Sequence, residues 1–380
     1  MKSFIRLIMI GVPATFSLYS CEKGAKPTDQ SSTNQRVELL NAKPTQNIQG
    51  SVSVFSSGFN NPRGLKWGPD GNLYVAEGGV GGTTITDQCA QVVFPIGPYK
   101  GSLYGGRISK VNWQGVRTTL TDSFPTSSAN EIIGGYVEGV ADVAFVGNQL
   151  YALLAGAGCS HGVPKVPNGI VKVDANGKWW MIANLSEWQM SHPVANPEPD
   201  DFEPDGTWYS MISLQGDLYA VEPNHGELVK VTTNGNISRV IDISASQGHI
   251  VPTALSYHGN FYVGNLFTFP IPGGASKIFK ITPSAQIKAV ATGLNTVLGL
   301  VFDDRDRMYV LEMTVGAPFP TSGMGRVLRI DPNGNMSVIA SGLSLPTGMT
   351  MGPDGNLYVS NVGLGPNAIG GGQVLKITLP

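Results

Sequence analysis

The chain has 380 residues, a formal net charge of −2 and only 14% charged residues, and it contains 49 glycines and 26 prolines. This balance excludes the basic surface of a nucleic-acid-binding protein, so we expect no nucleic-acid partner. The abundance of turn-forming residues favours an extracytoplasmic protein built from β-strands.

Residues 1–20 have the pattern of an export signal. Lys2 and Arg6 precede an apolar run, residues 7–18, which is too short to cross a membrane as a helix. The sequence Leu18-Tyr19-Ser20-Cys21 is similar to a bacterial lipobox, and it predicts a lipid attached to Cys21. Ordinary cleavage that leaves Cys21 as a free thiol stays open as the alternative.

Residues 21–49 are polar and rich in Lys, Asn, Gln, Ser, Thr and Pro, which is typical of a disordered tether. Together with the lipobox, this segment predicts an exported lipoprotein held at the membrane by its lipid alone, in the periplasm or on the cell surface. The folded domain is expected over residues 50–380.

A tyrosine returns six times in the same local frame, in which a polar residue and an apolar residue precede it and an apolar run follows. The six copies are Tyr74, Tyr151, Tyr219, Tyr262, Tyr309 and Tyr358. Insertions lengthen a base period of about 40–45 residues, which is the length of one four-stranded propeller blade. The repeat predicts six blades.

Each repeat has the pattern of four short strands joined by tight Gly, Asn and Asp turns, which are hairpin signals. The last repeat has only three, whereas residues 51–59 have the pattern of a fourth strand. We therefore predict an all-β, six-bladed propeller whose N-terminal strand completes the last blade and closes the ring. Such closure leaves only short edges, and we expect a monomer.

Long insertions gather on one face of the predicted ring, which we call the top face. Because the strands of a blade are antiparallel, the connections between second and third strands and those between blades emerge on the same side. Insertions on one face of a repeat ring mark the binding face. We expect a small molecule, a glycan or a protein there. The insertions are residues 78–105, 155–168, 186–206, 264–275, 313–325 and 362–372.

Carboxylates and amides stand three residues after five of the six tyrosines, and two interpretations stay open. They hydrogen-bond the backbone around the neighbouring blade, or they surround the central mouth and hold a divalent cation such as Ca²⁺ or Mg²⁺. The residues concerned are Glu77, Glu222, Asn265, Glu312 and Asn361. Residues near the start of the first strands are expected to line the mouth and contact a ligand: Arg63, Asp142, Tyr209, Thr253 and Thr347.

Histidines break the symmetry of the repeat. His161, His192, His225 and His249 map to the top face, whereas His258 falls in a bottom turn. A histidine beside a carboxylate can act as a general acid or base, which makes His225 with Glu222 the candidate catalytic pair. His161 and His249 are candidate ligand contacts. Loop histidines without a function are the alternative.

Two further features lie in the top insertions. Residues 198–205 hold five carboxylates, which predicts either a calcium loop or a solvated acidic loop. Cys89 and Cys159 occupy corresponding insertions of the first two blades, and they are candidates for a disulfide in an oxidising compartment.

Several motifs resemble those of the ScyD/ScyE family of six-bladed propellers, over nearly all of residues 50–380. They are residues 61–65, 81–84, 156–162, 167–169 and 262–266. The chain also resembles, at the level of fold, the NHL, gluconolactonase-like and virginiamycin B lyase-like propellers. The resemblance implies a fold and no settled reaction. It fails in the third blade, where Glu222-Pro223-Asn224-His225 replaces an Asp-Ala-Gly-type turn.

Two functions remain open. The first is a lipid-anchored binding or scaffold propeller that uses its top face, because propellers are neutral scaffolds for grafted sites. The alternative is a cation-dependent lyase or lactone hydrolase at the central top mouth. In that alternative the Glu and Asn ring holds the metal, and His225 moves a proton.

Overall fold

A computed structural model describes residues 40–41, 44, 46–133, 135–199, 202–316 and 318–380. Residues 38–380 form one compact unit. The export signal, Cys21 and most of the expected tether lie outside the described residues. Among the helices of the described part, none is long and apolar enough to cross a membrane.

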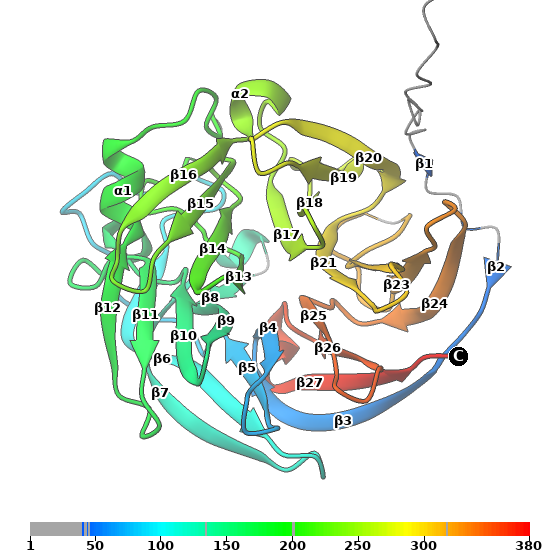
Figure 1. The fold of residues 1–380 in the computed structure, drawn as a ribbon. Helices are drawn as coiled ribbons and strands as arrows, with labels where there is room; N and C mark the ends of the chain where they lie inside the picture. Colours follow the sequence, from blue (N-terminus) through cyan, green and yellow to red (C-terminus); the bar gives the residue numbers. More distant parts are fainter. Residues whose placement is uncertain (1–39, 42–43, 45, 134, 200–201, 317) are drawn as a thin grey trace, which may run out of the picture. The chain divides into compact units, whose positions relative to one another are not determined.

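Six antiparallel sheets are arranged in a ring, with the first strand of each sheet nearest the centre (Figure 1). The prediction of an all-β, six-bladed propeller is confirmed.

The first three blades follow the chain in order. Blade 1 consists of β4 (Pro62–Trp67), β5 (Leu73–Glu77), β6 (Lys100–Val111) and β7 (Arg117–Ser128), with β8 (Val137–Glu138) paired to β7. Blade 2 consists of β9 (Val140–Val146), β10 (Gln149–Leu154), β11 (Gly169–Val173) and β12 (Trp179–Asn184). Blade 3 consists of β13 (Ser210–Leu214), β14 (Asp217–Glu222), β15 (Glu227–Val231) and β16 (Ile237–Asp242).

The other three blades complete the ring. Blade 4 consists of β17 (Pro252–Tyr257), β18 (Phe261–Asn265), β19 (Ser276–Ile281) and β20 (Ile287–Leu294). Blade 5 consists of β21 (Val297–Phe302), β22 (Met308–Glu312), β23 (Gly325–Ile330) and β24 (Met336–Leu343). Blade 6 consists of β25 (Gly348–Met351), β26 (Leu357–Asn361), β27 (Ile369–Thr378) and β3 (Ser51–Asn60).

Short helices and added strands lie outside this pattern. The helices are α1 (Leu185–Ser191) and α2 (Ser244–Gln247), and the 3₁₀ turns are η1 (Glu131–Ile133), η2 (Cys159–His161) and η3 (Pro366–Ala368). β1 (Leu40–Asn41) and β2 (Gln46–Asn47) add in parallel to the outer strands β20 and β24. These additions cover part of two edges that would otherwise be open to another chain.

The ring closes where the sequence predicts it. β3 pairs antiparallel with the C-terminal strand β27, with Ser56 opposite Val374 and Val52 opposite Ile377. Phe59 of β3 is fully buried. The closing strand therefore supplies both backbone hydrogen bonds and core to the last blade.

The ring and the hydroxyl of the repeated tyrosine each have a structural role. The rings of Tyr309 and Tyr358 are buried between blades, whereas their hydroxyls donate to Asp303 at 3.2 Å and Asp354 at 3.1 Å in the turn before the strand. Tyr74 makes the same bond with Asp70. A tyrosine thus fills the core and satisfies its own polar atom, which accounts for the repeated pairing of an Asp-containing turn with a tyrosine strand.

Apolar side chains of each sheet pack on those of the next. Leu153 and Ile170 of blade 2, for example, share a cluster with Leu218 and Val229 of blade 3. Burial of such a side chain contributes about 1.5–3 kcal/mol. The core therefore lies between blades, so each blade depends on its neighbours.

Two top loops are shorter than predicted, because β6 begins at Lys100 and β27 at Ile369. The pairing of β6 with β7 shifts register around Gly106, next to Gly105 with φ 125°. Glycines at such a bulge interrupt the alternating pattern by which a strand is recognised in a sequence.

We expect removal of residues 1–60 to abolish cooperative thermal unfolding, because β27 would lose its partner and Phe59 its place in the core. Removal of residues 1–49 eliminates β1 and β2 but keeps β3, and it should leave the melting temperature within a few degrees of the full chain. Differential scanning calorimetry checks both, and a cooperative melt without β3 would contradict closure as the stabilising feature.

Candidate functional site

Three residues expected at the central mouth join blades to one another. The Thr253 hydroxyl donates to the carbonyl oxygen of Val297 at 2.5 Å, and the Thr347 hydroxyl donates to that of Pro62 at 2.5 Å. The Tyr209 hydroxyl reaches from blade 3 to the carbonyl oxygen of Thr347 near β25, at 2.8 Å. These side chains fix the spacing of the inner strands.

The centre of the ring leaves little room beside these side chains. A central cavity lined by Asp142, Tyr209 and Thr347 measures about 20 Å³, which is close to the space that one water molecule needs. Burial raises the pKa of Tyr209 to about 12, and the nearby Arg63 opposes the shift. Arg63 donates to the carbonyl oxygen of Val137 at 2.5 Å and makes no ion pair with a described carboxylate. Its guanidinium is half-buried.

The five strand-end groups hydrogen-bond to the segments that lead into their own blades. Their partners are Asn60 N–H for Glu77 (2.6 Å), Thr207 N–H for Glu222 (2.8 Å), the Ile250 carbonyl for Asn265 (2.8 Å), Asn295 N–H for Glu312 (2.5 Å) and Ser344 N–H for Asn361 (2.9 Å). The carboxylates of Glu77 and Glu312 also pair with Arg107 and Arg326.

These contacts favour the structural interpretation of the ring over the metal interpretation. Glu77, Glu222 and Glu312 are not part of any close group of three metal-ligating His, Cys, Asp or Glu side chains in the described part of the chain. The structure therefore does not gather the expected ligands around one cation.

We expect Glu312→Gln to lower the free energy of unfolding by on the order of 2 kcal/mol, because the half-buried Arg326 would lose the counter-charge of the buried Glu312. Asp306→Asn, at an exposed bottom turn, should change it by less than about 0.5 kcal/mol. Urea unfolding checks both values. A Glu312→Gln variant as stable as the wild type would argue against a structural role for this carboxylate.

A different group of side chains comes together on the top face, between blades 1, 2 and 3. His161 lies between two carboxylates: its Nδ1 is 3.3 Å from Glu138 Oε2, and its Nε2 is 3.3 Å from Glu203 Oε2. One ligand atom from each residue lies within 4.8 Å of the other two. His161 is completely buried and Glu203 is 1% exposed, whereas the Glu138 side chain keeps 11% of its surface exposed. Glu138 is thus the outward-facing member.

Three hydroxyl groups hold these side chains in place. The Tyr99 hydroxyl donates to Glu203 Oε1 at 3.0 Å, and the Thr207 hydroxyl donates to Glu138 Oε1 at 2.6 Å. The Ser127 hydroxyl lies 3.2 Å from His161 Nδ1. The Tyr99 ring also stacks on the imidazole, with 4.5 Å between ring centroids.

Burial dominates the electrostatics of this cluster. It raises the pKa of Glu138 to about 7, with a further upward contribution from Glu203. Burial likewise raises the pKa of Glu203 and lowers the pKa of His161. No described lysine or arginine lies within 4 Å of either carboxylate. The cluster is therefore an acidic site in which a bound cation would stabilise the ionised carboxylates.

The local fold explains how distant segments meet here. Glu138 ends β8, just before the inner strand β9, and His161 ends the turn η2. The insertion that carries Glu203 is tied to η2 by Asp205, which accepts hydrogen bonds from the backbone N–H and the hydroxyl of Ser160 at 2.8 and 2.7 Å.

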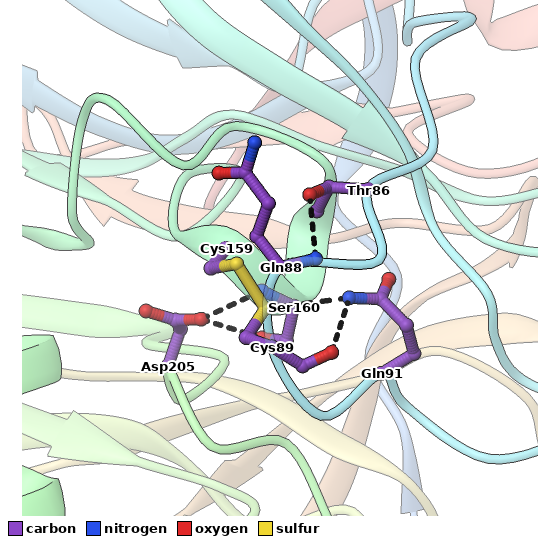
Figure 2. Close-up of a disulfide and its surroundings, with 7 residues drawn as sticks. All are labelled: Thr86, Gln88, Cys89, Gln91, Cys159, Ser160 and Asp205. Atoms are coloured by element: carbon purple, nitrogen blue, oxygen red, sulfur yellow. Dashed lines mark hydrogen bonds between the residues drawn. A yellow bond between two sulfur atoms is a disulfide. The ribbon is translucent and has the colours of Figure 1, made fainter.

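A disulfide secures the same turn from its other side. Cys89, from the long top loop of blade 1, bonds to Cys159, the first residue of η2 (Figure 2). Ser160 follows Cys159 in the chain and precedes His161, so both the disulfide and Asp205 hold the turn (Figure 2). The expected pairing of the two cysteines is confirmed.

The candidate pair Glu222 and His225 meets through the backbone. Glu222 accepts hydrogen bonds from the backbone N–H groups of Thr207, Asn224 and His225. The His225 ring instead contacts the backbone oxygen of Glu203, with its Nε2 at 3.0 Å. This arrangement does not favour a proton relay between the Glu222 carboxylate and the His225 ring.

The other histidines have separate surroundings. His249 Nε2 pairs with Glu198, and burial lowers the pKa of His249 to about 4. His192 is exposed and stacks on Trp188. His258 pairs with the exposed Asp306, as expected for a residue of a bottom turn.

The sequence points to only part of the cluster. His161 is among the expected ligand contacts, and Glu203 lies in the acidic run 198–205, of which residues 200–201 fall outside the described part. Glu138 and Tyr99 belong to no repeat frame and no motif. The one feature of the sequence that could have drawn attention to them is their place in insertions that the repeat does not require.

Two carboxylates and one imidazole can hold an ion, and the buried atoms that face inward fit this role. Glu138 Oε2, His161 Nε2 and Glu203 Oε2 have no hydrogen-bond partner among the described residues. Ca²⁺ and Mg²⁺ prefer ligand sets made of oxygen alone, whereas imidazole suits transition metals. The donor set therefore fits a divalent cation, and it combines His161 and Glu203, which the sequence singles out, with Glu138, which it does not.

A second hollow on the top face has a different character. A pocket of about 300 Å³ opens between the top loops of blades 4 and 5, and it is lined by residues that include Ile271, Asn295, Thr296, Thr314 and Phe319. None of its lining residues is acidic or basic. It can accept an uncharged molecule but offers no acid–base or metal chemistry.

Comparison with known proteins gives the fold. No protein-family profile and no curated protein sequence matches the chain. Among solved structures, a Thermus thermophilus protein named as an oxidoreductase of the glucose dehydrogenase type superposes with a TM-score of 0.54 and 17% identity, over 86% of this chain and 99% of that one. The gluconolactonase XC5397 of Xanthomonas campestris superposes with a TM-score of 0.52 and 12% identity, over 87% of this chain and 90% of that one.

Virginiamycin B lyase from Staphylococcus aureus gives a TM-score of 0.46 and 11% identity, over 87% of this chain and 99% of that one. Identities this low show a shared fold and no shared activity. ScyD/ScyE stays a resemblance of sequence motifs. The chain is similar in fold to solved propellers that include a gluconolactonase.

Proposed function

We propose that the protein is a cation-dependent hydrolase or lyase that acts on a small carbonyl compound, such as a lactone, at the top of the ring. The observation that carries the proposal is the buried cluster of Glu138, His161 and Glu203, whose outward member Glu138 lies near the cation Arg63. Solved propellers of similar fold include a gluconolactonase, which supports a site of this kind on this scaffold.

The chain's own residues have separable roles in this proposal. Glu138, His161 and Glu203 would hold the cation, which would supply a Lewis acid for the substrate carbonyl. Arg63 presents guanidinium donors that orient a carboxylate or hydroxyl of the substrate. Tyr99, Ser127 and Thr207 keep the cluster in one geometry, and the insertions that carry Glu203 and His161 shield it from water.

We expect the full chain to turn over at least one member of a panel of aldonolactones, aromatic lactones and cyclic esters, followed by proton release in a pH-stat. Arg63→Met should lower kcat/KM on the order of 100-fold, because the substrate would lose its orienting contact. Arg305→Met, at a bottom turn, should leave turnover unchanged. Equal turnover by the Arg63→Met and wild-type proteins would contradict a reaction at the top mouth, and so would a panel without any substrate.

A binding or scaffold protein is the second candidate, favoured by the uncharged pocket between blades 4 and 5. A small molecule, a glycan or a protein without charge at the contact would suit it. Saturable binding to this pocket without any turnover in the lactone panel would favour this candidate over the enzyme. The monomer expected from ring closure suits both functions.

We also propose that the protein is exported and anchored at the membrane by a lipid on Cys21. The disulfide between Cys89 and Cys159 supports export, because disulfides persist in oxidising compartments. The polar residues 22–49 would then hold the propeller away from the bilayer.

We expect a bacterial host that processes lipoproteins to incorporate a palmitate analogue into the wild-type chain and to hold the protein in its membrane fraction. Cys21→Ser should lose the label and release the protein into the soluble fraction. The Cys89→Ser/Cys159→Ser double variant keeps Cys21 and should stay labelled. An unlabelled wild-type chain would contradict the anchor.

A further inference from the structure

We infer that Glu138, His161 and Glu203 form a zinc site with three protein ligands, and that the hydroxyls of Ser127, Tyr99 and Thr207 orient those ligands. This inference rests on the site of the proposed function and names its metal. It does not depend on the reaction that the site performs.

The strongest observation for a metal site is that each of the three residues has one hydrogen-bonded polar atom and one without a hydrogen-bond partner among the described residues. Each residue offers two polar atoms, and one of the two is held by a neighbouring hydroxyl: Glu203 Oε1 by Tyr99, Glu138 Oε1 by Thr207 and His161 Nδ1 by Ser127. The other atom of each, namely Glu203 Oε2, Glu138 Oε2 and His161 Nε2, has no hydrogen-bond partner in the described chain. Glu138 Oε2 lies 3.3 Å from His161 Nδ1 and Glu203 Oε2 lies 3.3 Å from Nε2, and one ligand atom from each residue lies within 4.8 Å of the other two.

This division matches the surroundings of metal ligands in proteins. A ligating histidine almost always bonds through its other nitrogen to a neighbour, which fixes the tautomer, and ligating carboxylates are hydrogen-bonded in the same manner. In the tautomer in which Nδ1–H donates to the Ser127 hydroxyl, the lone pair of Nε2 is left for a metal. Nε2 is also the nitrogen that lies 3.3 Å from Glu203 Oε2.

Burial makes a cation necessary for ionised ligands. His161 and Glu203 are buried, and an unpaired charge in such a place is costly. Two carboxylates and a neutral imidazole carry a charge of −2, which one divalent ion neutralises. Arg63 acts on Glu138 only through space, and no described lysine or arginine forms an ion pair with Glu138 or Glu203.

The donor types select the metal. Zinc takes His nitrogen and Asp or Glu oxygen as ligands, and its catalytic sites have three protein ligands with a fourth position open for water or substrate. Ca²⁺ needs six to eight oxygen ligands, and Mg²⁺ keeps most of its waters. Imidazole therefore favours zinc over either of the cations expected from the sequence.

The ligands come from three segments that are far apart in the chain: β8, η2 and the insertion between blades 2 and 3. The contact from Ser160 to Asp205 holds η2 to the insertion, the bond from Thr207 to Glu138 holds the end of that insertion to β8, and the disulfide fixes η2 to the top loop of blade 1. The site is consequently assembled before the metal arrives, and it gains little flexibility when the metal is removed.

The test uses tag-free full-length protein, stripped with dipicolinate and reloaded with ZnSO₄, and measures bound metal by elemental mass spectrometry. We expect one zinc per chain that survives gel filtration in excess Ca²⁺ and Mg²⁺. Replacement of zinc by Co²⁺ should give the visible absorption of a four- or five-coordinate nitrogen–oxygen site. Protein that returns free of zinc, or that loses zinc to Ca²⁺ or Mg²⁺, would overturn the inference.

Substitutions test whether these three residues bind the metal. His161→Gln and Glu203→Gln should each weaken zinc binding at least about 100-fold in competition with a chromophoric chelator, and Ser127→Ala should weaken it about 10–100-fold. The matched control is His249→Gln, which removes another buried histidine paired with a carboxylate and should bind zinc like the wild type. Equal zinc affinity of His161→Gln and wild type would overturn the site.

Two alternatives give distinct results. If His161 is instead an imidazolium shared between the carboxylates, the wild type binds no zinc and shows no cobalt spectrum, so the inference fails. If a ligand variant fails to fold, the zinc affinity of Ser127→Ala and the cobalt spectrum of the wild type still test the site. Zinc bound without turnover of any lactone supports the metal site and contradicts the proposed reaction. Turnover that requires Ca²⁺ or Mg²⁺, in protein that binds no zinc, supports the reaction and overturns the zinc site.

Discussion

The pairing of β3 with β27 is the constraint on which the rest of the structure depends. Each blade buries its apolar face against the next, so the clusters between blades are complete only when the last blade has its fourth strand. The strand-end groups such as Glu77 and Glu312 then act on a ring whose circumference is already fixed. They join each blade to the segment that leads into it. The side chains at these repeated positions therefore have a structural role.

The candidate chemistry arises where the symmetry fails. Blades 1, 2 and 3 carry the insertions that supply Tyr99, Glu138, His161 and Glu203, and two covalent or hydrogen-bonded ties hold those insertions together. Buried ionisable groups that no repeat position requires are costly to keep. Their accumulation at one point of an otherwise regular ring is what distinguishes this site from the carboxylates of the other blades.

The sequence predicts the ring well and the site poorly, for a physical reason. A tyrosine that repeats with an Asp-containing turn reports local packing, and the pattern of residues 51–59 reports a strand, so the blade number and the closure follow from nearby residues. The cluster depends on contacts between segments far apart, such as Tyr99 with Glu203. The regularity that reveals the fold also drew attention to Glu77, Glu222 and Glu312, which serve the repeat itself.

The hydrogen bond from Tyr209 to Thr347 links two inner strands that stand opposite each other in the ring (Figure 1). It works as a strut, because the inner strands of blades 3 and 6 cannot move apart without breaking it. The propeller is therefore braced across its diameter as well as closed around its circumference.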